Sequence, residues 1–438
     1  MEAPSPFTIH VPDDVLDDLR WRLQRARVVP DNVGAGLHDP NGAWAYGTDR
    51  DTLKDYVSHW LNGFDWREQE RKLNAFPHFT LLVNGLSTHF IHQRSQDPDA
   101  IPLLLVHGWP GSVVEFLKVL PLLNRFHVVA PSIPGYGWSE APKNPGASVV
   151  FMAEHFAELM RLLGYRHYCA QGGDWGAIIT SELAARHPES CVALHVNMCV
   201  GRQVPSTVPD LLKAILTIPF WTKEEWAGLR SSLYFRKYES AYQKIQGTKP
   251  QSLGYGLNDS PVGLLAWILE KFQTWSDCHG GRPEESGLTK DEILTDVMVY
   301  WTTQSITSSC RLYYETLALH PQAEQKSSRS SSRHFGNYVS VPTGVIWSPA
   351  EIIKVPRKVA ELFFNIKHWS TPSKGGHFFA FEQPQLMAQD LNHFFFEVIH
   401  FPDCVSQALA APAARRSWPL LMLGLLGCGL LALKRSRL

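Results

Sequence analysis

The sequence lacks an excess of charge of either sign. Its 41 lysines and arginines are matched by 42 aspartates and glutamates, so the formal net charge at pH 7 is −1. Proteins that bind nucleic acid usually carry a strong basic surplus. The composition therefore gives no indication of a nucleic-acid partner.

Paired cysteines and an apolar N-terminus are missing as well. The seven cysteines stand singly along the chain, without the spacing of a metal site or of a disulfide framework. An odd number of unpaired thiols is typical of a reducing compartment. Met1–Pro12 is polar and interrupted by prolines, so no secretory signal peptide is predicted.

Apolar residues are plentiful, at 44% of the 438 residues, which is enough for a large core. In the middle of the chain, short apolar runs alternate with helical periods, a pattern typical of a parallel sheet with crossover helices. An Asn84-Gly85 pair between Phe79–Val83 and Ser87–Ile91 predicts a hairpin before them. The candidate strands of the sheet are Leu103–Val106, Val128–Ala130, Tyr168–Gln171, Ala193–Asn197, Thr343–Trp347 and Lys367–Ser370.

The strand signal stops between about Gly201 and His320. This stretch is predicted to form helices rich in aromatic residues, inserted between two strands. An insertion of this size is typical of a lid over the carboxyl ends of the strands, where ligands bind. Gln325–Arg333, dominated by serine and arginine, is predicted to be a solvated loop.

The segment Gln171-Gly172-Gly173-Asp174-Trp175-Gly176 has the spacing of a nucleophile elbow, a tight strand–turn–helix connection. Asp174 occupies the position of the nucleophile. A carboxylate can attack a saturated carbon and form an ester, which water then hydrolyses. Taken alone, the same stretch is equally consistent with an ordinary glycine-rich turn.

Two further residues follow in the order nucleophile, acid, histidine that an α/β-hydrolase requires. His377 lies in the glycine-flanked segment Ser373–Phe378 after the last predicted strand, and Glu351 lies just past the preceding strand. A general base must reach the water that it activates, and a carboxylate must hold the imidazole in the right tautomer. Spacing alone leaves Glu361 and Glu382 open as alternatives to Glu351.

A third segment, Val106-His107-Gly108-Trp109-Pro110-Gly111-Ser112, follows a predicted strand and is expected to open a helix. In this fold such a loop supplies one backbone N–H of an oxyanion hole, and the residue after the nucleophile supplies the other. The predicted donors are the amides of Trp109 and Trp175. Losing one such donor costs about 3–4 kcal/mol of transition-state stabilisation.

Together these motifs resemble those of microsomal-type epoxide hydrolases, over a stretch from Pro6 to about Leu391. The resemblance implies an α/β-hydrolase fold, with a mostly parallel sheet and helices on both faces, an inserted helical lid and an N-terminal wrapping segment. The expected divisions are residues 1–95 for the N-terminal segment, 96–200 and 323–404 for the core, and 201–322 for the lid. The further matching segments are Phe64-Asp65-Trp66, Pro131–Gly137, Leu257–Gly263, Tyr300–Thr303 and Gly375–Glu382.

The resemblance also assigns roles to residues. It places the nucleophile on Asp174, the base on His377 and the acid on Glu351. Two lid tyrosines that donate to the epoxide oxygen fall on Tyr242 and Tyr313, although the adjacent Tyr314 leaves the second register open. The implied reaction adds water to an apolar epoxide, from xenobiotics or lipids, without a metal or a cofactor.

The tail of the sequence carries an apolar segment, Trp418–Leu433, with basic residues on both sides. As a helix it would rise about 24 Å, slightly less than a hydrocarbon core of about 30 Å, and the flanking basic side chains can snorkel. Ala408–Ala414 is predicted to be a linker, so we expect a C-terminal membrane anchor in the endoplasmic reticulum (microsomal) membrane, with the catalytic body facing the cytosol. The alternative is a buried terminal helix. Microsomal-type relatives usually carry an N-terminal span, so the resemblance does not imply this topology.

Two other functions remain open at this point. A haloalkane dehalogenase also uses an aspartate on this elbow, but it needs halide donors in place of a tyrosine pair. A degenerate hydrolase that only binds ligands is the second alternative, although all five catalytic positions are chemically intact.

Overall fold

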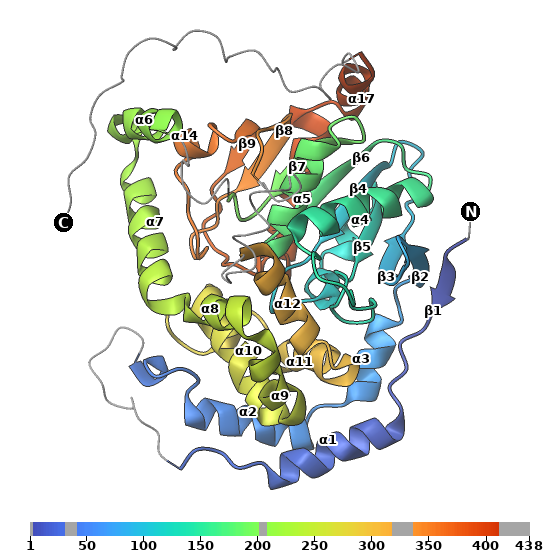
Figure 1. The fold of residues 1–438 in the computed structure, drawn as a ribbon, viewed down its shortest axis with the longest axis vertical. Coiled ribbons are helices and arrows are strands. Elements are labelled where there is room, and N and C mark those ends of the chain that lie inside the picture. The colour runs from blue at the N-terminus through green and yellow to red at the C-terminus, as the bar shows by residue number, and fades with distance from the viewer. Residues whose placement is uncertain (1–2, 31–41, 201–207, 318–335, 411–438) are drawn as a thin grey trace, which may run out of the picture.

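A nine-stranded sheet runs through the centre of the computed structural model, which describes residues 3–30, 42–200, 208–317 and 336–410 (Figure 1). The strand order is β1-β2-β3-β5-β4-β6-β7-β8-β9. The pairs from β1 to β5 are antiparallel, and the pairs from β5 to β9 are parallel. The strands are β1 Ser5–Phe7, β2 His78–Val83, β3 Leu86–Gln93, β4 Ile101–Val106, β5 Phe126–Pro131, β6 Tyr168–Gly172, β7 Cys191–Val196, β8 Val339–Ile346 and β9 Phe364–Ser370.

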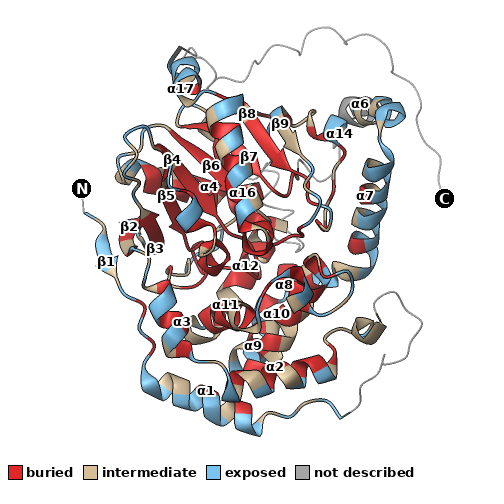
Figure 2. Ribbon diagram, turned by 180° about the vertical axis from the view of Figure 1, so that it is seen from behind, coloured by how far each residue is buried: buried red, intermediate tan, exposed pale blue. Residues whose placement is uncertain are grey.

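The central strands are apolar on both faces because helices cover both sides of the sheet. Leu103, Leu104 and Leu105 are successive residues of β4, and all three are fully buried. This is the pattern of an interior parallel strand. Figure 1 shows α4 and α5 over one face, and Figure 2 shows α16 over the other. The helices of this core are α4 Val149–Leu162, α5 Trp175–Arg186, α14 Arg357–Ala360, α15 Phe379–Glu382, α16 Pro384–Asn392 and α17 Phe401–Ala410.

The N-terminal part of the chain both extends the sheet and reaches around the lid. Its strands β1 to β3 form the antiparallel edge, whereas α1, α2 and α3 lie beside the lid helices (Figure 1). Arg22 on α1 donates hydrogen bonds to the backbone oxygen and the carboxylate of Asp259, the last residue of lid helix α9 (Pro250–Asp259), at 2.8 and 2.9 Å. The helices are α1 Asp13–Arg25, α2 Arg50–Asn62 and α3 Trp66–Leu73.

In residues 208–317, the main described part of the insertion between β7 and β8, the regular elements are all helices. Its inner helices, α10 to α12, are largely buried, whereas α6 and α7 form an outer arm that is mostly exposed (Figure 2). This lid arm, residues 208–234, exposes apolar side chains such as Leu216 and Leu233. The helices are α6 Val208–Thr217, α7 Lys223–Tyr234, α8 Ala241–Thr248, α9 Pro250–Asp259, α10 Pro261–Trp275, α11 Lys290–Thr303 and α12 Ile306–Leu317.

The predicted sheet, hairpin and helical insertion are all present, with small differences at element ends. Asn197 and Trp347 lie just beyond β7 and β8, and the loop that ends at Ser112 opens a short 3₁₀ helix, Val113–Phe116. The linker expected over Ala408–Ala414 is wrong in its first three residues, since they continue α17. The physical reason is that alanine and leucine are strong helix formers.

Two predicted segments, Gln325–Arg333 and Trp418–Leu433, lie outside the described residues. Among the helices that the structure does describe, none combines the length and the apolar character needed to cross a membrane.

Candidate active site

Asp174 sits in a strained turn between β6 and α5. Its backbone has φ 50° and ψ −125°, a region that residues with a side chain rarely adopt. The turn is tight because its neighbours are glycines: a Cβ on Gly176 would lie 2.0 Å from the Val106 carbonyl oxygen. Likewise, a Cβ on Gly108 would lie 2.3 Å from the Cβ of Asp174. The glycine spacing of the sequence therefore has a steric origin, and it presents the carboxylate at the end of a central strand.

The Asp174 carboxylate is held between a backbone amide and an imidazole. The Trp109 N–H donates to Oδ1 at 2.8 Å, and Nε2 of His377 lies 3.3 Å from Oδ2. Trp175 is the first residue of α5, so its N–H is among the amides that have no partner inside the helix. Both predicted oxyanion donors thus lie next to Asp174. The Trp109 amide contacts its carboxylate, and the Trp175 amide belongs to the next residue in the chain.

His377 and Glu351 form a buried pair. Nδ1 of His377 lies 2.6 Å from Oε1 of Glu351, which also accepts the N–H of Ile352. If Nδ1 carries the proton toward Glu351, Nε2 is left facing Asp174. Burial opposes a charged imidazole, but the charges of Glu351 and Asp174 outweigh it and raise the pKa of His377 well above its usual value.

The structure also separates the three carboxylates that spacing left open. Glu361 lies on the surface, in ion pairs with Arg357 and Lys358. Glu382 binds backbone amides instead of the imidazole. Glu351 is the one that contacts His377.

Tyr242 and Tyr313 meet at the same place from two lid helices, α8 and α12. Their ring centroids lie 5.9 Å apart, Tyr242 stacks on Trp109, and Tyr313 packs edge-on against Trp175. Burial raises the pKa of both hydroxyls, and the nearby charge of Asp174 adds to the effect, so both are protonated donors. The Tyr313 hydroxyl is buried without a hydrogen-bond acceptor among the described residues.

Tyr314, the alternative to Tyr313, faces elsewhere. It borders a separate cavity of about 340 Å³ that is also lined by Pro142 and Glu315. Residues next to each other on a helix point about 100° apart, so only one of the two can face Asp174. In this structure that residue is Tyr313.

A small chamber adjoins Asp174 and His377, with a volume of about 10 Å³. This is about the space that one water molecule requires. Its wall includes Glu115, Gln171 and Asn197, three residues that the sequence analysis missed. Oε1 of Gln171 is buried without a hydrogen-bond partner among the described residues, so it is available to accept a bond from a water.

The other contacts of these residues fix the wall of the chamber. Gln171 donates through Nε2 to Asn197 at 2.9 Å, and Asn197 donates to the carbonyl oxygen of His377 at 3.3 Å. Burial raises the pKa of Glu115 well above its usual value, which favours its neutral form. Gln171 opens the elbow motif and Glu115 follows the His107–Ser112 loop by three residues, and this closeness to the motifs is the only sequence signal for either.

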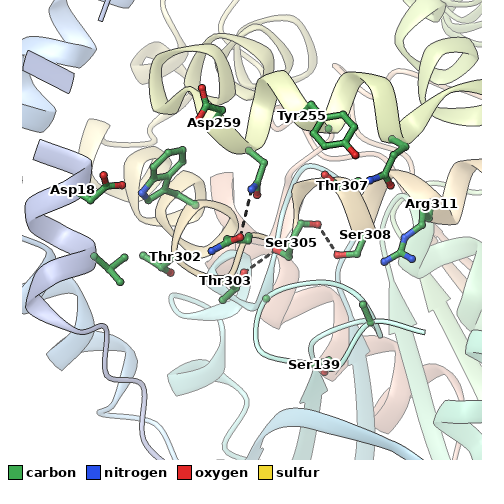
Figure 3. Close-up of a pocket in the computed structure, with 18 of the residues that line it drawn as sticks. Asp18, Ser139, Tyr255, Asp259, Thr302, Thr303, Ser305, Thr307, Ser308 and Arg311 are labelled. Carbon is green, nitrogen blue, oxygen red and sulfur yellow. Dashed lines mark hydrogen bonds between the residues drawn. The ribbon is translucent and has the colours of Figure 1, made fainter. Parts of the chain in front are cut away.

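A much larger cavity, about 970 Å³, lies away from these residues, where α1, α9 and α12 meet a core loop (Figure 3). Its wall is mainly polar and includes Asp18, Thr302 and Arg311. None of the predicted catalytic side chains lines it. Within the part of the chain that the structure describes, no group of three or more histidines, cysteines or carboxylates is arranged to hold a metal ion.

The chain is similar to known proteins along most of its length. Residues 4–116 match the family model described as epoxide hydrolase N terminus, and residues 101–384 match the alpha/beta hydrolase fold model. The chain is 38% identical to Epoxide hydrolase 1 of Sus scrofa over 417 residues, which cover 90% of this chain and 88% of the relative.

Two solved structures show the same architecture. Juvenile hormone epoxide hydrolase from the silkworm Bombyx mori matches with a TM-score of 0.78 at 31% identity, covering 93% of this chain and 95% of that one. Epoxide hydrolase from Aspergillus niger matches with a TM-score of 0.77 at 31% identity, covering 91% and 97%.

Proposed function

This chain belongs to the epoxide hydrolases of the α/β-hydrolase superfamily, and we propose that it converts apolar epoxides to vicinal diols through a covalent ester on Asp174. One observation carries the proposal. The Asp174 carboxylate lies between the Trp109 amide and His377, while two protonated lid hydroxyls, Tyr242 and Tyr313, lie close enough to feel its charge.

The first half of the proposed reaction opens the ring. A carboxylate oxygen of Asp174 attacks a ring carbon, and the carbon–oxygen bond on that carbon breaks. The electron pair moves to the epoxide oxygen, which receives a hydrogen bond and then a proton from Tyr242 or Tyr313. The product of this step is a hydroxyalkyl ester of Asp174.

The second half hydrolyses the ester. His377 removes a proton from water, and the resulting hydroxide adds to the carboxyl carbon of Asp174. The amides of Trp109 and Trp175 stabilise the oxyanion. When it collapses, the bond between the carboxyl carbon and the ester oxygen breaks, the leaving oxygen takes the proton of the new carboxylic acid, and the diol departs from a restored Asp174 carboxylate. The chamber beside His377 is the proposed position of this water, because it holds one molecule and offers the free oxygen of Gln171 as an acceptor.

Alkylation also changes the base. The charge of Asp174 helps to raise the pKa of His377, and the ester removes that charge. The pKa of His377 therefore falls when the ester forms. A protonated imidazole, which cannot act as a base, then gives its proton to the tyrosinate left by ring opening and becomes neutral for the step that needs it.

The chemistry around Asp174 favours apolar substrates. Trp109, Trp175, Trp275 and the two tyrosines surround the carboxylate with aromatic rings. An epoxide that is otherwise apolar, from a xenobiotic or a lipid, fits this lining. The similarity to a relative named juvenile hormone epoxide hydrolase supports an epoxide as the substrate.

The experiment that tests the ester is a single turnover in water labelled with oxygen-18. The diol formed first takes its new oxygen from Asp174, so it should be unlabelled, and the label should appear on Asp174. A labelled diol in the first turnover would mean that water attacks the epoxide directly, and the ester mechanism would be wrong. Release of halide from haloalkanes without diol formation would favour the dehalogenase alternative.

We further propose that the chain is organised as a wrapping segment (residues 1–95), a core in two parts (96–200 and 323–404) and a lid (201–322). The helical insertion supports a separate lid, and the family match over residues 4–116 supports a distinct N-terminal segment. Limited proteolysis is the test, since cleavage should begin near the limits of these parts. First cuts in the middle of the sheet would contradict the division.

The membrane anchor is a separate proposal. Its support is the sequence of Trp418–Leu433, which is apolar between basic clusters and outside the described residues. The full chain should pellet with endoplasmic reticulum membranes and resist alkaline carbonate, whereas a chain ending at Ala414 should be soluble and active. Aggregation of the shortened chain would identify the segment as a buried helix and overturn the anchor.

A further inference from the structure

We propose that Glu382 is a positioning residue for the hydrolytic step, which fastens the backbone on both sides of His377 to the end of lid helix α10. The proposal rests on the function proposed above, since it concerns the step in which His377 acts on the ester. Glu382 does not touch the reacting atoms, and it acts through the loop that carries the base.

The contacts of Glu382 enclose His377 in the chain. Oε2 accepts the N–H of Gly376 at 3.0 Å, and Oε1 accepts the N–H of Phe378 at 3.1 Å. These are the residues directly before and after His377. A buried carboxylate that binds both neighbours fixes the peptide planes from which the imidazole projects.

The same carboxylate reaches the lid. Oε2 of Glu382 also accepts the N–H of Asp277 at 2.8 Å, and Asp277 in turn accepts the N–H of Gly375 at 2.8 Å. In addition, the N–H of His377 itself donates to the carbonyl oxygen of Trp275 at 2.9 Å. Trp275 at the end of α10 and Asp277 just after it thus both bind the loop that carries His377.

The fit between lid and loop is tight. A Cβ on Gly376 would lie 2.6 Å from the Trp275 carbonyl oxygen and 2.8 Å from the Asp277 nitrogen. The Trp275 ring also packs edge-on against the His377 ring, with centroids 5.2 Å apart. Movement of the end of α10 would therefore change the position of the base.

Opposing effects act on the charge of Glu382. Burial raises the pKa of Glu382 to about 7, with a further rise from Asp277, while the amide donors and His377 oppose this shift. Cys278 is the other titratable group close to it. All three bonds of Glu382 are accepted ones, and the ionised carboxylate has the free lone pairs that they require.

The simplest alternative is that Glu382 only stabilises the short helix α15. The two roles differ in which chemical step they affect. Loss of stability lowers the amount of active enzyme and so reduces both half-reactions equally. Loss of positioning affects the hydrolysis of the ester, because the attack of Asp174 on the epoxide does not use His377 as a base.

The test is Glu382→Gln in the full chain, with alkylation and hydrolysis measured separately by rapid quench and mass spectrometry. Glutamine keeps the size of the side chain but replaces one acceptor oxygen by a donor. We expect hydrolysis to slow roughly 10- to 100-fold, the effect of losing one hydrogen bond to a charged group, while alkylation stays unchanged and the adduct on Asp174 accumulates. Glu361→Gln makes the same chemical change on a carboxylate at the surface, so it is the matched control and should change neither step.

Asp277→Asn provides a second variant on the lid side, in case Glu382→Gln does not fold. It should slow the same step, and hydrogen exchange of residues 275–278 and 375–378 should rise together. Equal slowing of both half-reactions in the folded variants, or no change in either, would overturn the proposal. If the wild-type chain forms no ester at all, the proposed function fails instead, so the two failures are distinguishable.

Discussion

The catalytic site has a core wall and a lid wall, which are built in different ways. On the core wall, Asp174, His377 and Glu351 follow the ends of strands and are joined to one another by short polar contacts. On the lid wall, Tyr242 and Tyr313 come from helices and are held mainly by aromatic packing. The core wall holds charge, and the lid wall holds neutral hydroxyls.

This difference explains how one site can carry out both ring opening and ester hydrolysis. The nucleophile must keep its negative charge and the base must be neutral when it acts, so both need polar partners that the sheet holds in place. A donor to a developing alkoxide must keep its proton, and burial among aromatic rings achieves this by raising the pKa of the tyrosines. Substitutions on the two walls should therefore affect different steps.

The largest effect is expected on the core wall, from His377→Gln. General-base assistance contributes roughly 10²- to 10⁴-fold, so turnover should fall by at least this factor. Because attack by Asp174 does not require the base, the variant should still be alkylated and should accumulate an adduct visible by mass spectrometry. An inactive variant without adduct would place the histidine in the first step and remove the contrast between the walls.

The lid wall should show the opposite pattern. Tyr313→Phe removes a hydrogen bond to the epoxide oxygen as charge develops on it, which is worth roughly 10- to 100-fold in the alkylation rate. Tyr242→Phe should act in the same direction, and neither variant should accumulate adduct. Tyr314→Phe is the matched control on α12, and slowing there in place of Tyr313→Phe would show that the register is wrong.

A smaller effect should appear in the pH dependence of the base. The pKa of His377 is raised in the resting enzyme and falls in the ester, so ester hydrolysis is gained as the pH rises through the lower pKa of the ester form. Removing the charge of Asp174 lowers the pKa, so Asp174→Asn should shift the His377 titration, followed by NMR, to lower pH. An unchanged midpoint would mean that alkylation does not switch the base.

The smallest effect is expected far from both walls, on the lid arm. Leu233 is 54% exposed on α7, so Leu233→Ser should leave both the thermal stability and the turnover of a water-soluble epoxide unchanged. Leu265→Ser on the buried helix α10 is the comparison, and it should lower thermal stability because it places a hydroxyl in the core. Similar losses of thermal stability in the two variants would show that the lid arm packs as tightly as the inner lid.

The sheet and the elbow were accessible from the sequence because their signals are local. Apolar runs identify interior strands, and the glycines around Asp174 are required by contacts within one strand–turn–helix unit. The choice among Glu351, Glu361 and Glu382 was not accessible from spacing, because it depends on how a loop folds back onto His377.

Other features needed the folded structure as well. Tyr313 and Tyr314 are chemically identical neighbours, and only the packing of α12 against Trp175 separates them. The chamber residues Glu115, Gln171 and Asn197 come from three separate segments that a sequence motif does not join. The helix over Ala408–Ala410 was missed because a run of alanines was interpreted as a spacer.

Because of the positive φ at position 174, the stability of the fold and the activity of the site favour different residues there. Holding a residue with a side chain in such a conformation costs about 1–3 kcal/mol, whereas glycine adopts it freely. Selection for a stable fold alone would favour glycine at position 174 and would erase the nucleophile. Directed evolution that screens only for heat resistance therefore pushes this site toward an inert protein, and retaining aspartate there records continuous selection for turnover.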